Sequence, residues 1–214
     1  MRFALLLMFA LPALCAAQTR SVQQLVRSDS MPNIAIEVDA SLSYLGSFRS
    51  LVMNNTAEAE RYIFGDIRNG QLRRVAIVHF ERFLPAAKGA FRYPRFRMRM
   101  VAGVEYLEQI WPLAEDLPAS EFFAPAQFQA ILNRWGVKPE PKWMMHRYVR
   151  AVDPAMQHEL ILFYLESESE AGVKVSELAK DWEPRGIAGA SGKAFEDAFR
   201  VRADAALRVI DAKQ

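Results

Sequence analysis

Arginines at alternating positions of one segment, Arg95, Arg97 and Arg99, are the residues whose type and spacing point most directly to binding chemistry. Alternate residues of a strand share one face and lie about 7 Å apart, a separation over which guanidinium groups can bind a carboxylate, phosphate or sulfate. Tyr93 precedes them and offers a stacking surface, and Trp111, next to a proline, is expected at a pocket rim. These five residues are therefore a candidate site for a small amphiphilic or anionic ligand.

The alternative is that these arginines are paired within the chain. No acidic residue lies between Lys88 and Arg99, whereas residues 100–133 carry five acidic residues and no basic one. Adjacent blocks of opposite charge are typical of neighbouring solvated surfaces that neutralise each other. A charged strand face can also dock a protein, so an envelope protein is the alternative partner.

A hairpin around Asn69-Gly70 is the clearest local signal in the sequence. The two residues stand between apolar runs, and both tolerate positive φ, as a type I′ turn requires. A tight turn pairs Arg68 with Gln71. The same register then places Asp66 opposite Arg73.

His79 lies in the second strand of this hairpin, and the register places Glu60 opposite it. A carboxylate beside an imidazole is half of a general-base arrangement, which would need a nucleophile. Serines that lie on neighbouring elements are Ser41, Ser43, Ser47 and Ser50. The sequence does not bring any of them within reach, so the alternative is a hydrogen-bonded structural pair.

Motifs for metal, nucleotide or covalent chemistry are missing from the sequence. The three histidines, His79, His146 and His158, have no second histidine or cysteine at metal-ligand spacing. No HExxH, Walker or GxSxG pattern occurs, and the segment GIAGASG does not follow a strand of a βαβ unit. We therefore expect no metal and no cofactor. The near-neutral charge gives no reason to expect nucleic acid as a partner.

The N-terminus has the pattern of a secretory signal peptide. Arg2 precedes an apolar run that ends at Leu14, too short for the roughly 20 residues of a membrane span, and small residues at Cys15 and Ala17 favour cleavage after Ala17. We expect a periplasmic or extracellular chain with no transmembrane anchor after cleavage. Lipidation of Cys15 is an alternative that Leu14 disfavours, and Asn54 begins a glycosylation sequon.

Cleavage removes the only cysteine and one arginine, so residues 18–214 contain no thiol and their net charge falls from +2 to +1. The whole chain is 51% hydrophobic, and without disulfides its stability must come from a hydrophobic core. Residues 18–32 are mostly polar and are expected to form a leader or linker. Residues 33–214 are expected to form one domain.

Periodicity predicts an antiparallel sheet of two or more hairpins with a middle helix. Alternating apolar residues indicate strands at residues 33–38, 43–53, 61–68, 71–83, 91–110, 142–152 and 157–166. A helix is predicted over residues 125–135, with Gly136 after its end, and a short one from Ser176. The segment around Pro112 and Pro118 is predicted to be a loop.

A long amphipathic helix is predicted at the C-terminus, over residues 193–212, with Ser191 as its N-cap. Strands followed by helices without βαβ alternation indicate an α+β fold, with this helix packed on one sheet face. A ligand cavity would be expected between the sheet and the helix.

Three functions follow as hypotheses. The first is an exported, non-enzymatic binding protein that holds a small amphiphilic or anionic ligand between the sheet and the C-terminal helix. The second is an interaction module of an envelope assembly, and the third is a hydrolase that uses His79. A closed apolar cavity would favour the first, and a solid core with a flat exposed edge strand would favour the second.

Overall fold

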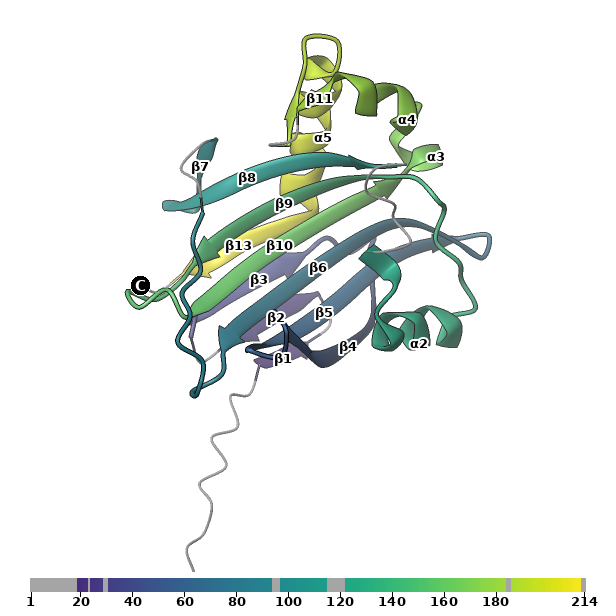
Figure 1. Cartoon of the computed structure of the whole chain (residues 1–214). Helices are drawn as coiled ribbons and strands as arrows, with labels where there is room; N and C mark the ends of the chain where they lie inside the picture. The colour runs from purple at the N-terminus through teal and green to yellow at the C-terminus, as the bar shows by residue number, and fades with distance from the viewer. Residues whose placement is uncertain are drawn as a thin grey trace, which may run out of the picture.

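The computed structural model of the chain describes residues 19–22, 24–28, 31–93, 97–114, 122–183 and 186–212, and it is mostly antiparallel β-sheet (Figure 1). The predicted signal peptide, with its cleavage site and Cys15, lies outside the described residues. No helix in the described part of the chain is long and apolar enough to cross a membrane.

The larger sheet has seven strands. In spatial order they are β4 (Ser43–Val52), β5 (Ala57–Arg68), β6 (Gln71–Phe83), β10 (His158–Ser167), β9 (Trp143–Ala151), β8 (Val104–Leu113) and β7 (Met98–Val101). A second sheet has the order β1 (Thr19–Val22), β2 (Leu25–Ser28), β3 (Ile34–Val38) and β13 (Leu207–Ala212). A short hairpin joins β11 (Trp182–Glu183) to β12 (Ile187–Ala188).

Helices are few and short among the described residues. They are α2 (Ala126–Arg134), α3 (Glu168–Ala171), α4 (Val175–Leu178), the 3-10 turn η1 (Ala179–Asp181) and α5 (Lys193–Ala206). In Figure 1, α2 lies in front of the seven-stranded sheet, and α5 and the smaller sheet lie behind it. We call these two sides of the large sheet the α2 face and the α5 face.

Each face of the large sheet has its own core because side chains of a strand alternate between faces. On the α5 face, Tyr164 of β10 packs with Phe199 of α5, and their ring centroids are 5.7 Å apart. On the α2 face, Ile77 of β6 belongs to a cluster that includes Phe128 of α2. The central strands β6, β9 and β10 carry buried apolar residues on both faces for this reason.

Several predicted elements are confirmed. Strand β3, strand β4, helix α2 and the β9–β10 hairpin occur where the apolar spacing indicated. Gly136 follows α2 with a φ of 65°, the left-handed conformation that glycine adopts without strain. The turn at Asn69-Gly70 also has positive φ at both residues, and Arg68 pairs with Gln71.

The register of that hairpin differs from the prediction beyond its first pairs. An extra residue on β6, Arg73, lies between Leu72 and Arg74 without a partner on β5 and shifts the ladder by one residue, so Asp66 pairs with Arg74. His79 therefore pairs with Arg61, and Glu60 pairs with Phe80. Because a shift of one residue reverses the faces, Glu60 and His79 lie on opposite sides of the sheet, and the predicted Glu60–His79 pair is wrong.

The predicted helix over residues 193–212 is too long. Helix α5 ends at Ala206, and the next six residues form β13, which pairs with β3. Leu207 and Val209 are buried and alternate as a strand requires, and the edge of β3 satisfies the backbone groups of this segment as a continued helix would have done. The N-cap is Gly192, and the Ser191 hydroxyl instead donates to Asp181, 2.5 Å away.

Two other segments differ from expectation. The predicted leader contains β1 and β2, and Val26 of β2 is fully buried against β3. The predicted strand at 91–110 is a hairpin of β7 and β8 that turns at Ala102-Gly103. Strand β8 continues through Pro112, which was predicted to be in a loop; beyond Leu107 it has no β7 partner, and an edge tolerates proline.

Candidate functional site

The predicted arginine stripe lies against a buried carboxylate of the chain itself. Glu108 of β8 is 2% exposed; it accepts hydrogen bonds from Arg97 Nε at 3.1 Å and Arg99 Nη1 at 3.2 Å. Arg200 of α5 and His146 of β9 also contact it, at 2.8 and 3.0 Å. Burial alone would raise the pKa of Glu108, but hydrogen bonds from His146 and Arg200 hold that pKa well below its ordinary value.

This cluster therefore ties β7, β8 and β9 to α5. Arg99 extends it, because its Nη2 lies 2.6 Å from Asp204 of α5. Of the acidic block, Glu108 binds both Arg97 and Arg99, and Glu196 and Asp204 of α5 supply further carboxylates; Glu108 is buried, not part of the solvated surface that the alternative interpretation described. Arg95 lies outside the described residues.

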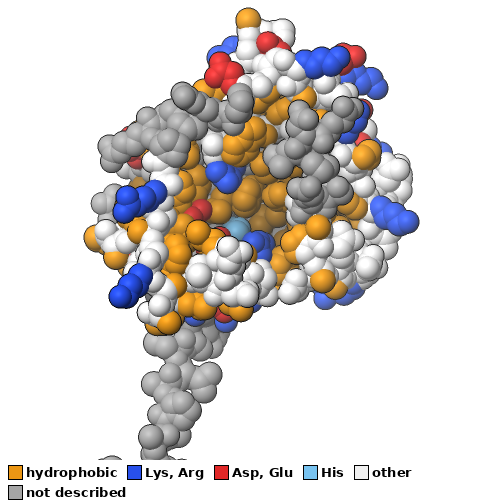
Figure 2. All heavy atoms as spheres, viewed as in Figure 1, with side chains coloured by type: hydrophobic (Ala, Val, Ile, Leu, Met, Phe, Trp, Pro, Cys, Tyr) orange, Lys and Arg blue, Asp and Glu red, His pale blue; other side chains and the backbone are white. Residues whose placement is uncertain are grey.

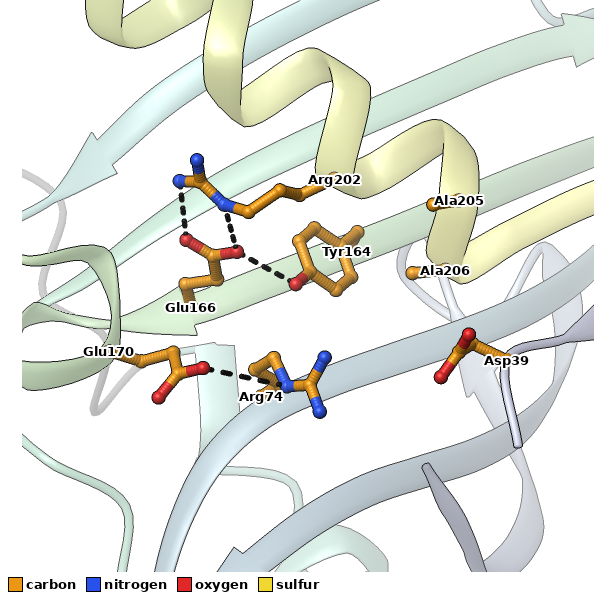
Figure 3. Close-up of a pocket in the computed structure, with 8 residues that line it drawn as sticks. All are labelled: Asp39, Arg74, Tyr164, Glu166, Glu170, Arg202, Ala205 and Ala206. Atoms are coloured by element: carbon orange, nitrogen blue, oxygen red, sulfur yellow. Dashed lines mark hydrogen bonds and ion pairs between the residues drawn. The ribbon is translucent and has the colours of Figure 1, made fainter. Parts of the chain in front are cut away.

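A small pocket lies between the large sheet and the C-terminal end of α5, close to where the sequence predicted a ligand cavity (Figure 3). Its volume is about 180 Å³, below the roughly 300 Å³ at which ligand sites usually begin. Its lining residues are Asp39, Arg74, Tyr164, Glu166, Glu170, Arg202, Ala205 and Ala206.

The charges of this pocket are largely satisfied within the chain. Arg202 binds both carboxylate oxygens of Glu166, at 2.7 and 2.8 Å, and Tyr164 donates to the same carboxylate (Figure 3). Arg74 binds Asp66 with two nitrogens, at 2.9 and 2.8 Å. The pocket is too small for an amphiphile and leaves little charge unpaired to attract an anion.

The α2 face of the large sheet is hollowed, and Figure 2 shows apolar side chains in the hollow with basic, acidic and histidine side chains among them. Buried residues of this face include Ile161 and Phe163 of β10 and Met145 of β9. Partly buried aromatic residues packed against them are Phe48, Tyr93, Trp111 and Phe122. The sheet thus presents an apolar concave surface on the side opposite α5.

Five charged or titratable side chains share this face, and we call them the open-face cluster. They are Arg61 on β5, His79 and Glu81 on β6, Glu159 on β10 and Arg147 on β9. His79, 4% exposed, has its Nε2 3.1 Å from Glu81 Oε2. Register places Glu159 directly opposite Glu81 and Arg61 directly opposite His79.

Burial shifts the titration of this cluster. It lowers the pKa of His79, so the imidazole is neutral near pH 7 and its Nε2–H donates to Glu81. Burial, aided by repulsion from Glu81, raises the pKa of Glu159 to about 7, although the nearby Tyr93 and Arg147 oppose the shift. Desolvation also lowers the pKa of Arg61 and of Arg147.

Arg61 and Arg147 have neutral close partners, unlike Arg99, Arg200 and Arg202 of the α5 face; Arg150 of that face also has a neutral partner, the Tyr106 ring, at 5.4 Å. Arg61 donates to Ser50 Oγ at 2.8 Å and lies 5.3 Å from the centroid of the Phe48 ring. Arg147 donates to the Gln109 side chain and lies 5.0 Å from the Trp111 ring centroid. Among the residues that the structure describes, neither makes an ion pair within 4.0 Å.

The structure therefore divides the predicted site residues. Tyr93, Trp111 and His79 lie on the α2 face, whereas Arg97 and Arg99 bind Glu108 of the α5 face. Sequence reasoning missed Arg61, Glu81, Arg147 and Glu159. The available signal was a charged residue at an inward position of an apolar strand, such as Arg147 between Met145 and Val149.

The described residues contain no group of three or more histidine, cysteine, aspartate or glutamate side chains placed to hold a metal ion. Comparison with protein-family models, with curated proteins and with solved structures found no match.

Proposed function

We propose that this chain is an exported binding protein that holds an amphiphilic anion in the hollow of the α2 face. Arg61 and Arg147 would bind the anionic group, and the apolar surface around Phe163 would receive the hydrocarbon part. The N-terminal signal pattern supports export. The observation that carries the proposal is the pair of partly buried arginines whose close partners are neutral.

A partly buried cation without a carboxylate partner is costly, because burial removes water that neutral partners replace only in part. On the α5 face, Asp204, Glu108 and Glu166 form ion pairs with Arg99, Arg200 and Arg202 and so offset this cost. On the α2 face, the anionic group of a ligand would pair with Arg61 and Arg147 and offset the cost of burying them. The proposed ligand site is thus on the opposite side of the sheet from the predicted one.

The two other hypotheses have less support. The docking module would use the charged face of Arg97 and Arg99, which are bound to Glu108. The hydrolase would need a nucleophile beside His79, but its Nδ1 has no hydrogen-bond partner among the described residues and its Nε2 contacts Glu81. Neither hypothesis gains a supporting contact from the fold.

The test uses two dyes of similar shape. Anilinonaphthalene sulfonate carries an anionic group that stays ionised, and phenylnaphthylamine lacks it. Removing a hydrogen bond to a charged group costs about 1.5–3 kcal/mol, so Arg61→Gln and Arg147→Gln should each weaken sulfonate binding by about 10- to 100-fold. Both variants should bind phenylnaphthylamine as the wild type does.

Arg82→Gln is the matched control, because Arg82 lies on β6 but is exposed and paired with Glu58. Its dye affinities should equal those of the wild type. Equal sulfonate affinity in all three variants and the wild type would refute the proposed site.

A further inference from the structure

We infer that the carboxyl pair of Glu81 and Glu159 couples ligand binding to proton uptake, so that the α2 face takes up an anion together with one proton. The inference rests on the proposed function and adds a regulatory property to the same site. No covalent bond changes; the proton comes from solvent and is held by the carboxyl pair.

The geometry of the pair is the first support. Glu81 on β6 and Glu159 on β10 are cross-strand partners, and their side chains lie on the same face. Glu159 is 6% exposed, and only 10% of the Glu81 side chain is exposed. Like charges directly opposite each other repel strongly when they are shielded from water. Two ionised carboxylates at this place are therefore unfavourable.

The surroundings determine which carboxyl group is protonated. His79 Nε2 lies 3.1 Å from Glu81 Oε2 and donates a hydrogen bond to this carboxyl group. Tyr93 lies beside Glu159, and Arg147 on the next strand attracts it from a distance. Arg61 on β5 lies directly across from His79, and its guanidinium group attracts the Glu81 carboxylate. The raised pKa of Glu159, about 7, agrees with a proton that rests on this residue.

The charge balance explains the coupling. With both carboxyl groups ionised, Arg61 and Arg147 are balanced by Glu81 and Glu159, and the cluster has no net charge because His79 is neutral. With Glu159 protonated, the cluster carries one net positive charge and attracts a monoanion. A bound anion in turn favours the protonated form of Glu159, as linkage requires.

The experiment measures the affinity for anilinonaphthalene sulfonate between about pH 6 and pH 8.5 at constant ionic strength. The wild-type affinity should fall with rising pH above about 7, with a limiting slope of about tenfold per pH unit for one coupled proton. Glu159→Gln should remove the slope and bind at high pH as tightly as the wild type does near pH 6. The neutral dye should show no slope in either protein.

Glu58→Gln is the control for a carboxylate on the same sheet outside the cluster, since Glu58 pairs with Arg82. It should keep the wild-type slope. Calorimetry of the wild type in buffers of different ionisation enthalpy measures proton uptake directly and needs no variant. Uptake should rise towards one proton per bound sulfonate above pH 7.

If the wild-type affinity for the sulfonate does not change with pH and no proton is taken up, the coupling is wrong. The proposed function would still stand in that case, provided that the arginine variants bind the sulfonate more weakly. Unchanged sulfonate affinity in Arg61→Gln and Arg147→Gln would refute both the proposed function and the coupling. A wild-type slope that persists in Glu159→Gln would also overturn the assignment of the proton to this pair.

Discussion

Arg61 on β5 lies directly across from His79 on β6 because a bulge at Arg73 of β6 advances the ladder by one residue. Without the bulge, His79 would lie beside Glu60 on the α5 face, and Val78 would take its place opposite Arg61. The bulge thus selects which side chains of β6 face the hollow. A local irregularity near the turn determines the charge of a site about six residues further along the strand.

Glu159→Gln should stabilise the free protein at high pH. Because the folded pKa of Glu159 is raised to about 7, its contribution to stability is fully present below its ordinary value of 4.5 and is lost as pH rises through about 7. Urea unfolding at pH 8 should show the variant more stable by on the order of 2 kcal/mol. The two proteins should have similar stability near pH 4, and equal stability at pH 8 would contradict the raised pKa.

For Glu108→Gln, the difference in stability from the wild type should depend on pH in the opposite sense. The folded pKa of Glu108 is lowered, so its stabilising contribution is present above its ordinary value of 4.5 and is lost as pH falls below it. At pH 7 the variant should be less stable by about 3 kcal/mol, because it leaves Arg97, Arg99 and Arg200 without one of their carboxylate partners. Thermal unfolding at several pH values measures this difference, which should shrink towards pH 3.

The stability of the protein should respond differently when an arginine of the α5 face and one of the α2 face lose their charge. Arg200→Met leaves Glu108 with fewer partners and should lower the free energy of unfolding by about 3 kcal/mol. Arg147→Met removes a partly buried cation without an ion pair among the described residues and should keep the stability or raise it by about 1 kcal/mol. Denaturant unfolding without ligand compares them, and similar losses would argue that Arg147 has a structural role.

Phe199→Ala should test how much α5 contributes to the fold. Phe199 is fully buried and contacts Tyr164 and Phe195, so its truncation should cost about 3–5 kcal/mol. Val201→Ala on the same helix is the control, because Val201 is 68% exposed, and it should change stability by less than about 0.5 kcal/mol. Similar losses of stability in the two variants would show that the burial of Phe199 contributes little to the free energy of unfolding.

Elements whose signal is local were predictable from the sequence. The Asn69-Gly70 turn, helix α2 with Gly136 at its end and the β9–β10 hairpin depend on neighbouring residues and short-range spacing, and the structure has them where predicted. The sequence by itself also determined that its single cysteine allows no disulfide within the chain, so that stability must come from the core. An antiparallel sheet with few helices followed from the same periodicity.

Only the tertiary structure decided the features that depend on distant partners. Residues 207–212 continue a helical pattern, but the edge of β3 is available and they become β13. The bulge on β6 reversed the expected pairing of His79, because a shift of one residue exchanges the faces of a strand. Arg97 and Arg99 were the expected anion site, yet Glu108 of β8 binds both of them, and Glu196 and Asp204 of α5 bind Arg97 and Arg99 respectively. Charge pairing between elements far apart in the sequence thus decides which arginines remain for a ligand, and periodicity along one strand carries no information about it.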